Sequence, residues 1–107
     1  MDEKHNDDLQ IVFTDGRTFP VRITYKDLYA LERKGKYERE LDDFWKVRDK
    51  GFEGDRSELL LINFLYVAYL CACEGDAMSF DEFIDGLHMA DIGKHIALYV
   101  QLTSKKK

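Results

Sequence analysis

The sequence has few of the residues that form cross-links, metal sites or chain kinks. Its 107 residues include two cysteines, three histidines and one proline. Cys71 and Cys73 are two positions apart, and such positions diverge by about 200° on a helix, so we expect neither a disulfide nor a shared metal between them. His88 and His95 are too few for a zinc site without further ligands. We therefore predict free thiols, no metal and no cofactor.

The chain also lacks an excess of positive charge and any catalytic motif. Its 21 acidic residues outnumber the 16 Lys and Arg, for a formal net charge of −5. The basic residues between positions 33 and 50 alternate with acidic ones, which is typical of a solvated mixed-charge face and argues against nucleic-acid binding. The sequence has no glycine-rich phosphate loop, no nucleophile elbow and no Cys/His catalytic arrangement. We therefore expect a protein that is not an enzyme.

The one long apolar run covers residues 59–73, where Asn63 is the only strongly polar side chain. It is shorter than the roughly 20 residues that a membrane span needs. The acidic segment 1–8 lacks the apolar core of a signal peptide, so we expect no membrane partner and a cytoplasmic location. The run therefore predicts a helix over 56–74 that is apolar on every side and must be covered by other elements.

Alternating apolar residues predict a β-hairpin over residues 9–23. The apolar positions are Leu9, Ile11 and Phe13 on the first strand and Phe19, Val21 and Ile23 on the second. A two-residue loop would place these two sets on opposite faces, whereas a three-residue loop over 14–16 pairs Ile11 with Phe19. The longer loop also gives Gly16 the left-handed position of a bulged turn. We therefore predict the three-residue loop, with the nitrogen of Pro20 on an open edge.

Start and stop signals predict five helices. Their approximate ranges are 25–34, 37–49, 56–74, 80–90 and 92–102. Thr24 is a good cap for the first helix and Gly35 a good stop, while Ser79 and Glu82 form a capping box before the fourth. The last segment also alternates as a strand would, and we favour the helix.

These elements predict an α+β fold that is mostly α. An N-terminal hairpin precedes four to five helices, which pack around a central apolar helix. We expect a single globular domain over 9–102 between a disordered acidic tail, 1–8, and a basic tail, 103–107.

The central apolar helix is also the candidate partner-binding element. If one of its three apolar stripes stays open, it exposes a patch of the kind that marks an interaction site. If the helices at 37–49 and 92–102 cover that stripe, the helix is an ordinary core helix, and the sequence leaves both alternatives open. Aromatic side chains dominate such interfaces, so the candidate partner-binding residues are Trp45, Phe64, Tyr66 and Tyr69.

Three local strings stand out beside the order of the elements. They are Ile23-Thr24-Tyr25-Lys26-Asp27-Leu28, Leu65-Tyr66-Val67-Ala68-Tyr69-Leu70 and Ser79-Phe80-Asp81-Glu82-Phe83-Ile84-Asp85. Together with the N-terminal hairpin they resemble the small tail assembly chaperones of long-tailed, siphophage-type bacteriophages. The resemblance covers residues 9–90, and the charged segment 36–55 has no counterpart in it.

The resemblance implies a non-enzymatic protein of the host cytoplasm that binds the tape-measure protein and keeps it soluble while the tail tube assembles. The tail-tube protein is a further implied partner. The family also makes a longer product by programmed frameshifting, and residues 105–107, all lysine, are compatible with an adenine-rich slippery site. The alternatives are a homo-oligomeric structural or adaptor subunit that buries the same helix face, or a small regulatory protein.

Overall fold

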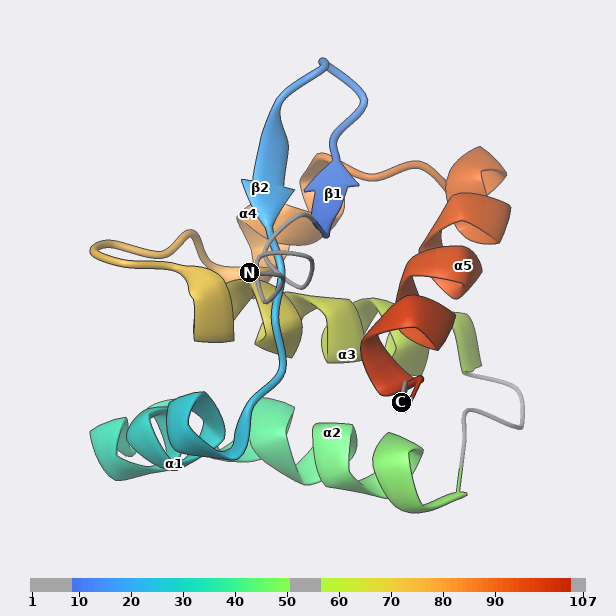
Figure 1. The fold of residues 1–107 in the computed structure, drawn as a ribbon. Coiled ribbons are helices and arrows are strands. Elements are labelled where there is room, and N and C mark those ends of the chain that lie inside the picture. The colour runs from blue at the N-terminus through green and yellow to red at the C-terminus, as the bar shows by residue number, and fades with distance from the viewer. Residues whose placement is uncertain (1–8, 51–56, 105–107) are drawn as a thin grey trace, which may run out of the picture.

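The computed structural model describes residues 9–50 and 57–104 (Figure 1). The elements are β1 (Gln10–Val12), β2 (Thr18–Pro20), α1 (Tyr25–Lys34), α2 (Glu38–Lys50), α3 (Ser57–Ala72), α4 (Phe80–Asp85), the 3₁₀ turn η2 (Met89–Asp91) and α5 (Ile92–Thr103). This is the mostly-α fold with an N-terminal hairpin that the sequence predicts. The predicted acidic tail, 1–8, and the last residues of the predicted basic tail, 105–107, lie outside the described residues.

Helix α3 runs through the middle of the molecule. α1 and α2 lie along one side of it, the hairpin and α4 lie on the opposite side, and α5 stands across one end (Figure 1). Asn63, the one strongly polar residue of the run, is buried, and its Nδ2 donates a hydrogen bond of 3.0 Å to the Glu40 carbonyl of α2. Because that amide is paired, the helix tolerates it in an otherwise apolar setting.

The hairpin has the register that the parity of its apolar residues predicts. Ile11 is opposite Phe19, and the Phe13 N–H donates to the Arg17 carbonyl at 2.8 Å, which leaves a three-residue loop over 14–16. Gly16 in that loop has φ +94°, a left-handed conformation that glycine adopts without a steric penalty. The predicted loop is therefore confirmed.

Two of the predicted helix signals are seen directly in the caps. The Thr24 side chain accepts from the Asp27 N–H at 3.1 Å, and Gly35 ends α1 in the left-handed conformation. At α4 the capping box is complete, because Ser79 Oγ accepts from the Glu82 N–H and a Glu82 carboxylate oxygen accepts from the Ser79 N–H. The last segment is a helix, as favoured.

The prediction of a single helix over 80–90 is wrong, because α4 ends at Asp85. The Gly86 carbonyl accepts from the Thr14 N–H of the hairpin at 2.9 Å, so the hairpin loop is attached to the end of the helix. A Cβ on Gly86 would lie 2.3 Å from the Phe13 ring, so only glycine fits there. After this contact the chain turns, and the His88 Nδ1 accepts from the Ala90 N–H to begin η2.

Candidate interaction groove

Three of the four predicted partner-binding residues lie in the core. Phe64, Tyr66 and Tyr69 are each less than 5% exposed, and only Trp45 remains half-buried. Phe64 stacks on Phe44 of α2 with ring centroids 4.6 Å apart. The prediction of surface aromatic anchors is therefore wrong for these three, because neighbouring elements already cover them.

The two tyrosines instead hold the segment that leads into α4. The Tyr66 hydroxyl donates to the Met78 carbonyl at 2.8 Å, and the Met78 N–H donates to the Tyr69 hydroxyl at 3.0 Å. Burial raises the pKa of Tyr66 above its usual range. Both hydroxyls thus bind the backbone of one residue, which positions the Ser79 cap directly after it.

The structure also decides between the two alternatives for α3. Residues 61–72 are buried apart from the half-buried Ile62, because α1 and α2 pack on one side, the hairpin and α4 on the opposite side, and α5 across one end. α3 therefore has no open stripe along its length, and only its first turn, at Leu59, reaches the surface with 54% of the side chain exposed.

At this first turn the molecule has an apolar hollow, which we call the interaction groove. Its volume is about 310 Å³. It is lined by Glu58, Leu59 and Ile62 from α3, Ile84 from α4, Leu87 and His88 from the connection, Met89 from η2, and Ile92 and His95 from α5. Six of these nine side chains are aliphatic or thioether groups, which is the composition of a site that binds apolar side chains.

The early end of α4 creates this groove. Since the chain leaves the helix at Gly86, Leu87 and Met89 form a wall between α4 and α5 instead of continuing one helical surface. Met89 is 75% exposed at the rim, facing solvent with no cover from the described residues. Methionine is flexible and polarisable, so it adapts to different apolar partners.

His95 lies at the base of the groove and is only 4% exposed. Burial is the largest influence on this imidazole and lowers its pKa, while Asp91 has a smaller opposing effect. The ring is therefore neutral at pH 7, so the floor of the groove carries no charge. Glu58 contributes the only carboxylate among the lining residues.

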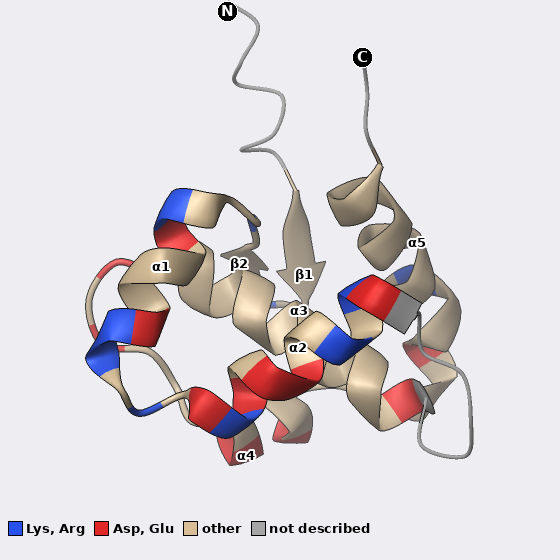
Figure 2. Cartoon of the chain, turned by 90° about the horizontal axis from the view of Figure 1, so that it is seen from below, with Lys and Arg blue, Asp and Glu red and all other residues tan. Residues whose placement is uncertain are grey.

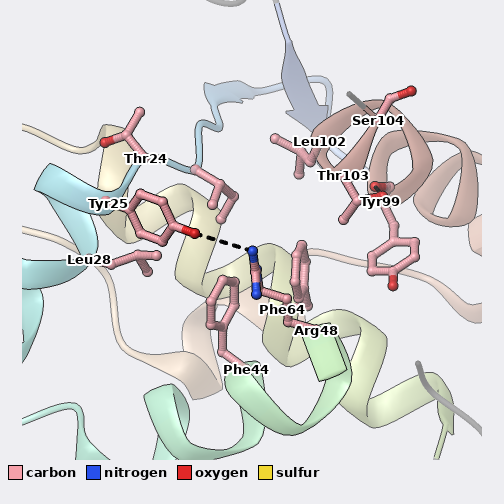
Figure 3. Close-up of a pocket in the computed structure, with 11 residues that line it drawn as sticks. Thr24, Tyr25, Leu28, Phe44, Arg48, Phe64, Tyr99, Leu102, Thr103 and Ser104 are labelled. Atoms are coloured by element: carbon pink, nitrogen blue, oxygen red, sulfur yellow. Dashed lines mark hydrogen bonds between the residues drawn. The ribbon is translucent and has the colours of Figure 1, made fainter. Parts of the chain in front are cut away.

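A second hollow of about 530 Å³ lies between the start of α1, α2, α3 and the end of α5 (Figure 3). Phe44 and Phe64 form its floor, and Arg48 lies across it with a hydrogen bond of 3.4 Å from Nη2 to the Tyr25 hydroxyl. This hydrogen bond joins α1 to α2 across the hollow, and the Tyr25 side chain is 73% exposed. The second hollow is therefore crossed by a polar contact, whereas the interaction groove is open and apolar.

The described residues hold no cluster of three or more His, Cys, Asp or Glu that suits a metal ion. Cys71 and Cys73 are free thiols, and burial raises the pKa of Cys71 to about 12. At neutral pH this thiol is protonated and behaves as a small apolar residue.

Sequence reasoning missed the groove because its residues belong to separate predicted helices, Leu59 to the helix over 56–74 and Leu87 and Met89 to the single helix over 80–90. The signal that was available is Gly86, since a glycine inside a helical pattern lowers the expectation that the helix continues.

Charged residues are concentrated on α1, α2 and α4, while α5 is almost free of them (Figure 2). No helix in the described part of the chain is long and apolar enough to span a membrane. In comparisons with known proteins, no family model, no curated protein and no solved structure matches this chain.

Proposed function

We propose that this chain is a non-enzymatic binding protein that acts as a phage tail assembly chaperone in the host cytoplasm. Its interaction groove takes the apolar side chains of a helical segment of the tape-measure protein and keeps that protein soluble until the tail tube assembles around it. The observation that carries the proposal is the open apolar groove with Leu59 and Met89 at its surface. The resemblance of the three sequence strings supports the choice of client.

The dimensions of the groove suit one face of a helix. A volume of about 310 Å³ is at the lower end of ligand-site volumes, and it accommodates two or three aliphatic side chains rather than a whole element. An amphipathic helix presents such side chains at positions i, i+3 or i+4, and i+7. The acidic surface elsewhere keeps the complex in solution.

The test is co-expression of the chain with the tape-measure protein from the same genome, followed by measurement of the soluble fraction and of co-purification. The double variant Leu59→Asp, Met89→Asp places two carboxylates in the apolar groove. Because both side chains are exposed, we expect the variant to fold with an unchanged melting temperature and to lose capture of the client.

The matched control is Tyr29→Asp, which changes another exposed apolar side chain, 59% accessible, on α1. We expect it to capture the client as the unchanged chain does. If the unchanged chain does not solubilise the tape-measure protein, the proposed client is wrong. If the groove variant captures it as well as the control does, the proposed site is wrong.

A further inference from the structure

Exposed apolar side chains gather on one side of the molecule. Among the described residues, eight large apolar side chains are exposed. Tyr25 and Tyr29 lie on α1, and Tyr25 lines the second hollow beside the end of α5. Leu59, Ile84 and Met89 belong to the interaction groove beside the start of α5. On the other flank of α5, Val12 of β1 lines a separate hollow together with Lys94 and Leu98. Ile96 and Val100 lie on the helix itself.

The outer face of α5 forms a stripe of its own. It consists of Gly93, Ile96, Ala97, Val100 and Gln101, all of them exposed. Ile96 is 40% and Val100 52% exposed, and α5 contains a single Lys, Arg, Asp or Glu residue, Lys94, in a chain with 35% charged residues. We call these five residues the α5 stripe. It is a ridge rather than a hollow, which distinguishes it from the groove.

We propose that the α5 stripe is the contact between two copies of this chain in a symmetric dimer. Ile96 and Val100 are four positions apart and form a raised row. Gly93 and Ala97, also four apart, form a low row directly beside it. In an isologous contact the same surface meets itself, so the raised row of each copy fits into the low row of the other. Packing of rows four residues apart gives a helix crossing angle of about −50°.

The distribution of charge favours a second copy over other occupants. Each copy carries a formal net charge of −5, so a self-contact through α1, α2 or α4 would bring dense charged surfaces together (Figure 2). The five residues of the α5 stripe are uncharged, and Lys94, the one charged residue of α5, is exposed at its border. A contact centred on Ile96 and Val100 therefore keeps like charges out of its desolvated centre. The uncharged α5 stripe also cannot form salt bridges with a partner that has a charged surface.

The size of the surface sets the expected strength. A standard interface buries about 800 Å² on each partner, and one helix face of 12 residues, about 18 Å long, supplies only part of that area. We therefore expect a weak dimer with a dissociation constant in the micromolar range.

The first test is sedimentation equilibrium of the full chain from low micromolar to submillimolar concentration. We expect the mass to rise from 12.6 kDa towards twice that value. Ile96→Glu with Val100→Glu should remain at the monomer mass throughout, with unchanged circular dichroism, and Tyr29→Glu should dimerise normally. An unchanged chain that stays monomeric at every concentration overturns the proposal, and so does a stripe variant that dimerises like the control.

Two further variants locate the contact without adding charge. A Cβ on Gly93 meets no atom within 4 Å, so Gly93→Leu fills the low row while leaving the monomer intact, and we expect it to weaken the dimer at least tenfold. In a Cys73→Ser background, Ala97→Cys should cross-link two copies on mild oxidation, and Tyr29→Cys should not. Dimers that form normally in Gly93→Leu, or that cross-link at position 29 and not at 97, overturn the assignment to this stripe.

Discussion

The hydrogen bond between Tyr66 and Met78 should be measurable as a contribution to stability. Tyr66→Phe removes one hydroxyl and keeps the ring, which packs against Phe83 with centroids 5.2 Å apart. The bond it removes is 2.8 Å long and part-buried. Loss of such a bond, with the Met78 carbonyl left without that donor, costs about 1–2 kcal/mol in the free energy of unfolding.

Urea denaturation followed by circular dichroism measures this cost. With a slope of about 1.5 kcal/mol/M, the midpoint should fall by about 1 M, and the melting temperature by about 4–8 °C for each kcal/mol lost. The matched control is Tyr25→Phe. That hydroxyl accepts a longer bond of 3.4 Å from Arg48 at an exposed site, so we expect a loss below about 0.5 kcal/mol.

The same tyrosine gives the prediction a dependence on pH. Burial raises the pKa of Tyr66 in the folded state, while in the unfolded chain it ionises near pH 10. The contribution of the protonated hydroxyl is therefore present below about pH 10 and is lost as the pH rises above it, because the unfolded state then releases the proton first. The difference between the unchanged chain and Tyr66→Phe should shrink in that range. Equal midpoints for the two proteins at pH 7 would refute the reasoning.

Three further substitutions test how the hairpin, α4 and α5 fit together. Gly86→Ala should destabilise the fold by about 1–3 kcal/mol, because the new Cβ would overlap the buried Phe13 ring. A denaturation midpoint equal to that of the unchanged chain would contradict this close contact. Gly93→Ala should raise stability by about 0.4–1 kcal/mol, since its Cβ meets open space in a helix; a lowered melting temperature would count against it. His95→Gln should reduce the loss of stability as the pH falls below about 6.5, because burial lowers the pKa of His95 and the unfolded state therefore binds the proton first. Parallel slopes for His95→Gln and the unchanged chain in pH-dependent denaturation would show that another group is responsible.

Local sequence signals predicted much of the fold because each depends on residues close together in the chain. The hairpin register followed from the parity of Ile11 and Phe19, and the start of α4 followed from the reciprocal hydrogen bonds of Ser79 and Glu82. The presence of the helix α3 followed from an apolar run with one polar residue. These signals need no knowledge of what lies across the molecule.

The sequence alone therefore determined the order, type and caps of most elements, while the tertiary structure decided which surfaces remained open. The end of α4 at Gly86 depends on Phe13 and Thr14, more than 70 positions earlier in the chain. The buried positions of Tyr66 and Tyr69 depend on how the hairpin and α4 cover α3. An apolar residue has the same sequence signature whether its own fold or a partner covers it, because the driving force is the removal of surface from water and has no direction. Only the packing of distant elements distinguishes the buried aromatics of α3 from the exposed groove and the α5 stripe.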